Sequence, residues 1–219
     1  MSENRVVIFD FDGLILDTET VELNLWRKIF SEHDILFDLE SYLKTIGSIT
    51  SKTYEPSKIL AEVVKNGETP SDIYRKVEKQ IIDQLDGEKP LPGVLKTIQT
   101  AKSMGIKTAV GSSSTLDWVK PHLVRLGIWN QFDTVVTFED VNECKPSPEI
   151  FLKVLERLDV QPHNAIVLED SENGVLAARR AGIPVIVIPN EVTKNQVFTG
   201  AILKLSTLED LDLKEFFSY

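Results

Sequence analysis

Short runs of apolar, largely β-branched residues constrain the fold of this chain more than any other feature of its sequence. Within each run there is little or no alternation between apolar and polar residues, a pattern typical of strands buried on both faces. The runs are Val6–Phe9, Ile106–Val110, Thr134–Phe138, Ala165–Leu168, Pro184–Ile188 and Ala201–Leu205. Between most of them lie helical patterns, so the sequence predicts an α/β fold with a parallel sheet and helices on both of its faces.

Three helical patterns between these runs have apolar residues at helical spacing: Gly93–Met104, Leu116–Leu126 and Pro148–Leu158. A fourth, Gly174–Ala181, is short and rich in small residues. Glycines at 105, 127 and 182 follow three of them and suit helix C-caps. We therefore expect a Rossmann-like core in which strands and helices alternate.

One stretch interrupts the alternation, between the first predicted strand and the second. It contains four further helical patterns, Thr18–Glu32, Leu39–Thr45, Ser57–Lys65 and Ser71–Leu85. We interpret residues 17–87 as an inserted helical cap domain, and residues 1–16 and 88–219 as the α/β core domain. The return segment, Asp86–Gly93, is rich in Pro and Gly and suits a hinge.

The net charge and the composition of the chain limit the kinds of partner that it can bind. The chain has 219 residues and a formal net charge of −10, which disfavours binding to nucleic acid or to an anionic membrane surface. The sequence has a single cysteine, Cys144, and no apolar run reaches the roughly 18 residues that span a bilayer. We expect a cytoplasmic protein without nucleic-acid or membrane partners, either a monomer or a weak homo-oligomer.

The first chemical candidate is Asp10-Phe11-Asp12-Gly13, directly after the first predicted strand. Side chains two residues apart leave an extended strand on the same face, and ligands of parallel sheets bind beyond the carboxyl ends of the strands. Two such carboxylates repel each other unless a cation lies between them or one keeps a proton. The pattern therefore suits either a nucleophile and an acid/base pair that share a magnesium ion, or a plain turn.

A second acidic segment, Glu169-Asp170-Ser171, follows the run Ala165–Leu168. Asp170 or Ser171 could cap the next helix, and this role does not exclude metal binding. Hard cations prefer carboxylate oxygens, so Asp10, Asp12 and Asp170 together predict a Mg²⁺ site.

Two further segments follow strands in the same way. Ser112, Ser113 and Ser114 could present hydroxyl and backbone N–H groups to an anion, although taken alone the spacing favours Ser114 as the N-cap of the helix Leu116–Leu126. Lys145 stands before Pro146, in a loop that two prolines restrain, where a fixed ammonium could neutralise phosphate oxygens. The sequence has neither a Walker phosphate loop nor a dinucleotide-binding glycine motif.

Taken together and in order, these segments resemble the haloacid dehalogenase superfamily of phosphotransferases, and more narrowly its β-phosphoglucomutase-like phosphatases with a small helical cap. The segments that carry the resemblance run from Asp10 to Glu19, then Ser112, then from Lys145 to Phe151, then from Glu169 to Gly174.

The resemblance implies a role for each residue of the site. Asp10 would attack phosphorus and form an aspartyl phosphate, while Asp12 would protonate the leaving alcohol and later activate water. Mg²⁺ would be held by the Asp10 carboxylate, the Asp12 carbonyl and Asp170, with Glu169 nearby. Ser112, Ser113 and Lys145 would hold the phosphoryl oxygens of a small phosphorylated metabolite such as a sugar phosphate.

Two departures bear on the type of reaction. The sugar-phosphate mutases of this group resemble one another in carrying a histidine on the first cap helix, where this chain has Glu22, and an arginine after a cap-loop glycine. Here Gly47 is followed by no arginine, only by Lys52. We therefore favour hydrolysis over a mutase. Dehalogenation, phosphonate cleavage and a non-enzymatic regulatory or binding role are weaker alternatives.

Overall fold

A computed structural model describes residues 4–47 and 54–217 of the chain, and its centre is a parallel sheet. In this part of the chain the sheet has six strands in the order β3-β2-β1-β4-β5-β6, all neighbours parallel. The strands are β1 (Val6–Phe9), β2 (Lys107–Gly111), β3 (Thr134–Val136), β4 (Ala165–Glu169), β5 (Val185–Val187) and β6 (Leu203–Lys204). The α/β fold class with a Rossmann-like core is confirmed.

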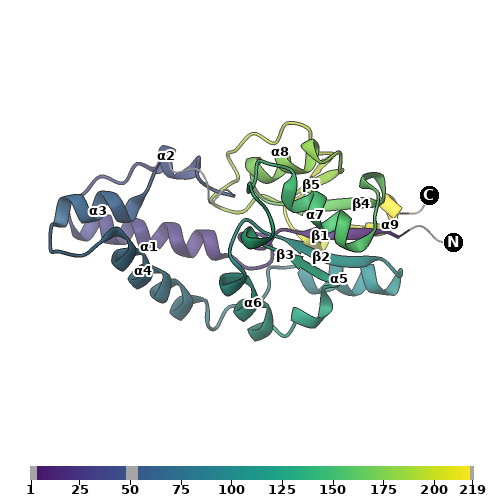
Figure 1. Ribbon diagram of the computed structural model, residues 1–219, viewed down its shortest axis with the longest axis horizontal. Helices are drawn as coiled ribbons and strands as arrows, with labels where there is room; N and C mark the ends of the chain where they lie inside the picture. The colour runs from purple at the N-terminus through teal and green to yellow at the C-terminus, as the bar shows by residue number, and fades with distance from the viewer. Residues whose placement is uncertain (1–3, 48–53, 218–219) are drawn as a thin grey trace.

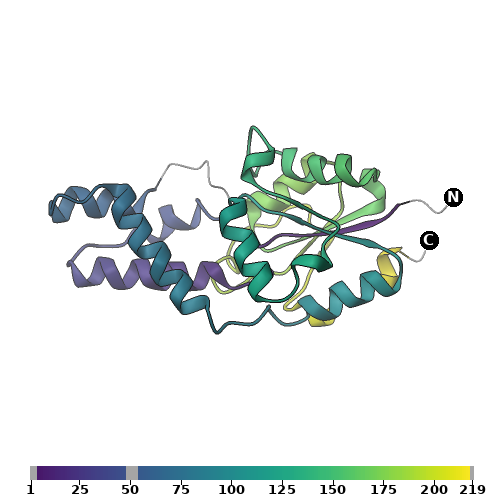
Figure 2. The ribbon, with the colours of Figure 1, turned by 60° about the horizontal axis from the view of Figure 1, so that its bottom comes forward.

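Helices cover both faces of this sheet, as Figure 2 shows. The helices α5 (Val94–Ser103) and α6 (Leu116–Arg125) lie on one face, and α7 (Glu149–Leu158) and α8 (Glu172–Arg180) on the other. Side chains of β1 alternate between the two cores: Val7 and Phe9 pack into the first, and Val6 and Ile8 into the second. Because both faces are buried, the apolar run has no polar positions.

The register of β1 brings the tips of three strands together. Phe9 is level with Val110 of β2 and with Leu168 of β4, so the next residues, Asp10, Gly111 and Glu169, reach the same edge. Since β1 lies between β2 and β4, the segments that follow these three strands surround one point beyond the sheet.

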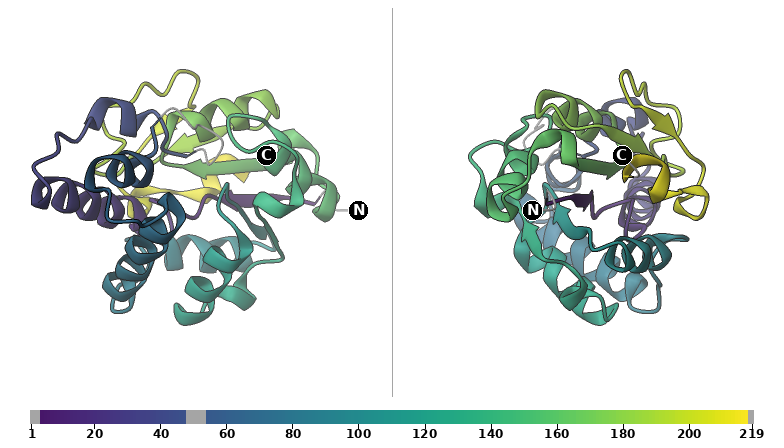
Figure 3. Two further views of the ribbon diagram at one scale, coloured as in Figure 1. Left: turned by 60° about the vertical axis from the view of Figure 1, so that its left-hand side comes forward. Right: turned by 90° about the vertical axis from the view of Figure 1, so that its right-hand side faces the viewer.

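The four helices of the long insertion lie at that same edge. They are α1 (Thr18–Glu32), α2 (Leu39–Leu43), α3 (Pro56–Val64) and α4 (Pro70–Leu85), and Figure 1 shows them at one end of the molecule, away from both termini. Figures 1 and 2 place both termini at the opposite end, and the right-hand view of Figure 3 looks onto that end. We call α1–α4 the cap helices; the division into a cap domain of residues 17–87 and a core domain of residues 1–16 and 88–219 stays a prediction.

Element ends differ from the sequence predictions by a few residues, for local reasons. The third strand stops at Val136, because Phe138–Asp140 forms a 3-10 turn, and α8 begins at Glu172, because the Ser171 hydroxyl accepts from the Gly174 N–H (3.1 Å). A last helix, α9 (Leu213–Phe217), was not predicted. In the described ranges, no helix has both the length and the apolarity needed to cross a membrane.

Candidate active site

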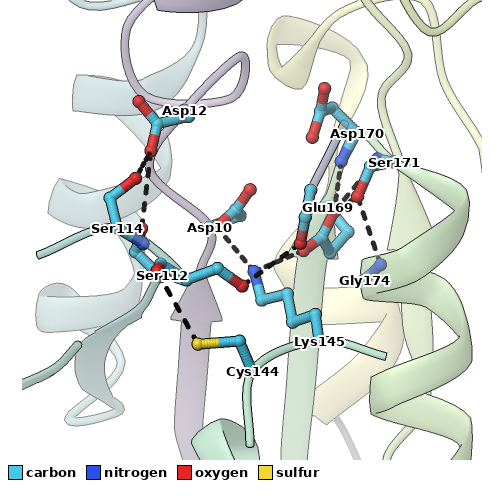
Figure 4. A network of polar contacts seen from close by, with 12 residues as sticks. Asp10, Asp12, Ser112, Ser114, Cys144, Lys145, Glu169, Asp170, Ser171 and Gly174 are labelled. Carbon is cyan, nitrogen blue, oxygen red and sulfur yellow. Dashed lines mark hydrogen bonds and ion pairs between the residues drawn. The ribbon is translucent and has the colours of Figure 1, made fainter. Parts of the chain in front are cut away.

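Asp10 lies at the tip of β1, and its buried carboxylate meets the ammonium of Lys145. The Lys145 Nζ is 2.6 Å from Asp10 Oδ1 and also 2.6 Å from Glu169 Oε1, so one cation bridges the tips of β1 and β4 (Figure 4). The Lys145 side chain is 1% exposed. A buried lysine is stable only when it is paired, and these two carboxylates pair it.

Glu169 is fixed by donors on both of its oxygens. Besides accepting from Lys145 through Oε1, it accepts through Oε2 from the N–H groups of Asp170 and Ser171 and from the Ser171 hydroxyl, each at 3.0 Å. Gly174 makes room for it, since a Cβ there would overlap the Glu169 carboxylate. These contacts hold Glu169 toward Lys145.

Asp170 provides the observation most relevant to a metal ion. Its Oδ2 accepts from Asn190 Nδ2 at 2.8 Å, whereas its Oδ1 is buried and has no hydrogen-bond partner among the described residues. Ligand atoms of Asp10, Glu169 and Asp170 all lie within 4.8 Å of one another. An unsatisfied buried carboxylate oxygen is costly, and a hard cation would satisfy it. The donor set therefore fits a divalent metal ion with oxygen ligands.

Asp12 also faces this region but is held by a different set of donors. Its Oδ1 accepts from Thr18 Oγ1 (2.7 Å) and from the indole Nε1 of Trp118 (2.8 Å). Its Oδ2 accepts from Ser114 Oγ (2.6 Å), with Ser112 Oγ farther away at 3.5 Å. Asp12 thus lies beside the serine segment, while Asp10 lies beside Lys145 (Figure 4).

The three serines have different surroundings. Ser112 Oγ accepts from the Ser114 N–H (3.0 Å), and Ser113 Oγ donates to the Gly47 carbonyl of the cap (3.1 Å). The predicted capping role of Ser114 is wrong: Thr115 is the N-cap residue of α6, it forms no side-chain cap, and the Ser114 hydroxyl is directed to Asp12 instead.

Burial of several acids near one lysine shifts their pKa values. Burial, reinforced by the charge of Glu169 and opposed by Lys145, raises the pKa of Asp10 to about 7. Burial likewise raises the pKa of Glu19 to about 8 and that of Asp170 well above its usual range. Burial alone would lower the pKa of Lys145, but Asp10 and Glu169 raise it above its ordinary value, so the ammonium stays charged.

Three residues near the site were not assigned a role from the sequence. Glu19 and Asp170 both accept from the Asn190 side chain at 2.8 Å, and Trp118 donates to Asp12. The only local signal for Glu19 is its place directly after Asp17-Thr18, at the start of α1. Asn190 and Trp118 carry no local signal, because they approach the site only after the chain has folded.

A pocket of about 330 Å³ opens above these groups, between the core and the cap helices. Asp10, Asp12, Lys145 and the three serines line its core side, whereas Asp170 and Glu169 are fully buried and do not line it. The cap side is lined by residues of α1, α2 and α4 and by the segment after α2, including Gly47. Lys52 and its neighbours in residues 48–53 lie outside the described residues.

Comparison with known proteins matches most of the chain. The family model of haloacid dehalogenase-like hydrolases matches residues 7–188. The Bacillus subtilis protein YhcW is 35% identical over 209 residues, 95% of this chain and 94% of YhcW. Fructose-1-phosphate phosphatase YqaB of Escherichia coli is 31% identical over 183 residues, 82% of this chain and 94% of YqaB.

A solved structure of a similar protein has the same fold. CbbY from Rhodobacter sphaeroides, in complex with phosphate, superimposes with a TM-score of 0.73 and 28% identity over 95% of this chain and 96% of CbbY. A variant of that protein has also been solved with xylulose-1,5-bisphosphate.

Proposed function

Because this chain belongs to the haloacid dehalogenase-like hydrolase family, we propose that it hydrolyses the phosphate monoester of a small metabolite through an aspartyl-phosphate intermediate, with Mg²⁺ as its metal. The chain is a phosphoric monoester hydrolase, like its relatives that are named as phosphatases. The observation that carries the proposal is the buried lysine shared by Asp10 and Glu169 beside the unsatisfied oxygen of Asp170.

In the proposed reaction, a carboxylate oxygen of Asp10 forms a bond to phosphorus as the bond from phosphorus to the leaving oxygen breaks. Asp12 gives its proton to that leaving oxygen and then takes one from the water that attacks the acyl phosphate. Lys145 neutralises charge on Asp10 and on the phosphoryl oxygens throughout. The protein contributes mainly positioning and charge neutralisation, as expected for phosphoryl transfer.

The metal would be held by Asp10 and Asp170, with the Asp12 carbonyl as a further predicted ligand. When bound, it would neutralise the phosphate charge and polarise a phosphoryl oxygen. Direct ligation by Glu169 stays a prediction, since in this structure both of its oxygens already accept hydrogen bonds. Glu169 would then act by holding Lys145.

Substrate size and relatives both point to a small phosphorylated compound. A pocket of about 330 Å³ accommodates a phosphorylated sugar or polyol but not a macromolecule. Among the similar proteins, one is named as a fructose-1-phosphate phosphatase and another as a phosphorylated carbohydrates phosphatase. We therefore propose a sugar or polyol monophosphate as the substrate, without nucleic-acid or membrane partners.

The test is phosphate release from p-nitrophenyl phosphate and from a panel of metabolite monophosphates, with and without Mg²⁺. Asp10→Asn should lower turnover by at least about 10³-fold, because the amide cannot form the acyl phosphate. Asp83→Asn, the same change on an exposed cap residue, serves as the matched control. Wild-type turnover in Asp10→Asn, or full activity in chelator, would refute the corresponding part of the proposal.

A further inference from the structure

The cap side of the pocket is acidic, although the substrate proposed for it is an anion. Glu22 and Glu78 line this side together with the hydroxyl-bearing residues Tyr42 and Tyr74. Among the pocket-lining residues in the described ranges, the one cation is Lys145, and it is committed to Asp10 and Glu169 at 2.6 Å from each. The phosphoryl group would therefore lie near the cation Lys145, whereas the rest of the substrate would lie near the carboxylates of Glu22 and Glu78.

Helix geometry directs these two acids into the pocket. On α1, Glu22 follows the pocket-lining residue Thr18 by four positions, and on α4 Glu78 follows Tyr74 by four. Residues at this spacing share one helix face. Because α1 packs against α4, the two faces meet above the phosphoryl site, and the acids come from independent helices.

Neither carboxylate is neutralised within the described part of the chain. Glu22 Oε1 accepts from the neutral indole Nε1 of Trp26 at 3.1 Å, and Glu78 forms no hydrogen bond or ion pair with any described residue. Burial raises the pKa of Glu22, and Asp12 and Glu78 add to the shift, which places these acids within electrostatic reach of one another. The pocket wall thus offers hydrogen-bond acceptors and negative potential.

We propose that Glu22 and Glu78 select the substrate by the charge of its leaving alcohol: an alcohol that bears an ammonium group is preferred to a neutral polyol, and one that bears a second anion is disfavoured. This inference rests on the proposed phosphatase function. Charge-assisted hydrogen bonds to the two acids would favour the ammonium, whereas a second phosphate or a carboxylate would be repelled. Under this inference, the enzyme would discriminate against bisphosphates such as the one solved with the CbbY variant.

The experiment uses three hexose derivatives phosphorylated at the same position: glucosamine 6-phosphate, glucose 6-phosphate and 6-phosphogluconate. Each is measured as kcat/KM for phosphate release or, where turnover is slow, as an inhibition constant against p-nitrophenyl phosphate. We expect specificity to fall in that order by about 3- to 10-fold per unit of charge, as for a carboxylate roughly 6 Å away in a partly solvated pocket. An equal or reversed order in the wild-type protein would overturn the inference.

Variants separate this selection from general damage. Glu78→Gln, and independently Glu22→Gln, should each lower the charge dependence across the series to about the square root of its wild-type value, because one of the two carboxylates remains. Glu62→Gln, the same change on an exposed face of α3, should keep the wild-type charge dependence. An unchanged charge dependence in both variants would also overturn the inference. Hydrolysis of p-nitrophenyl phosphate tests the proposed function itself: without it the phosphatase proposal fails, whereas activity combined with charge-blind specificity refutes only the role of the cap acids.

Discussion

Replacing Glu169 by Gln tests whether the buried ion pair has the structural role that its geometry implies. The Glu169 side chain is 0% exposed and accepts from Lys145 on one oxygen and from three donors on the other. A glutamine has only one acceptor oxygen. In either orientation its amide NH₂ therefore faces the Lys145 ammonium or the N–H groups of Asp170 and Ser171, and at least one buried donor loses its partner.

The expected cost follows from what remains after the substitution. Removing one partner of a buried ion pair typically costs about 3 to 5 kcal/mol, and because Asp10 still pairs Lys145 we expect the lower end, about 3 kcal/mol. For a chain of this size each kcal/mol lowers the melting temperature by about 2 to 4 °C, which gives a decrease of roughly 6 to 12 °C. Calorimetry in chelator, at a pH where Lys145 is charged, measures this decrease in melting temperature.

Two comparisons make this prediction specific. Glu62→Gln, an exposed change of the same kind, should alter the free energy of unfolding by less than about 0.5 kcal/mol. Combining Glu169→Gln with Lys145→Met should cost less than the sum of the single changes by about 1 to 3 kcal/mol, because the partners are in contact. Additive effects, or a cost below about 1 kcal/mol for Glu169→Gln, would refute the reasoning.

Three further predictions concern the acidic cluster. The folded protein keeps protons on Asp10 (pKa about 7) and Glu19 (pKa about 8) that the unfolded chain releases near pH 4. The free energy of unfolding of the metal-free protein should therefore fall as the pH rises from about 4 to 8. Denaturant melts in chelator that show a rise over this range would contradict this prediction. Asp170→Asn should lose the stabilisation by Mg²⁺, about 2.7 kcal/mol for wild type at 100 times Kd, yet melt no lower than wild type in chelator. A Mg²⁺-induced shift of melting temperature that is retained in differential scanning fluorimetry would exclude Asp170 as a ligand. Gly13→Ala should destabilise by at least about 1 kcal/mol in the same melts, since Gly13 has φ +75° and a Cβ would lie 2.6 Å from Asp170 Oδ2; a wild-type melting temperature would show that the loop relaxes.

Much of the fold was predictable because local and global preferences agree. The run Val6–Phe9 is apolar at every position and ends at Asp10, and β1 has the same bounds. The helix α1 also has the predicted bounds, since the Asp17 side chain caps it by accepting from the Thr20 N–H (3.2 Å). The rule that parallel strands bring their carboxyl ends to one edge then correctly placed Asp10 and Asp170 together.

Contacts made only by tertiary packing were not predictable. Glu19 reads in sequence as an ordinary acid in the first turn of a helix, and its burial depends on Asn190, 171 residues away. The sequence favoured the hydroxyl of Ser114 as a helix cap, but this hydroxyl donates to Asp12, 102 residues away in the sequence. Such choices depend on which segments the fold brings within hydrogen-bond distance, and periodicity carries no information about this.

The charge balance of the site explains why a stable fold would keep three buried carboxylates around one lysine. Asp10, Glu169 and Asp170 meet in the interior with a single lysine. In the metal-free protein their burial, together with the excess of negative charge, raises the pKa values of Asp10 and Asp170. Proteins rarely maintain such a cost unless it serves function. A divalent ion together with a phosphoryl group adds about as much positive as negative charge, so Lys145 and the metal must act jointly. Removing either should weaken phosphate binding more than the loss of one ordinary ion pair would.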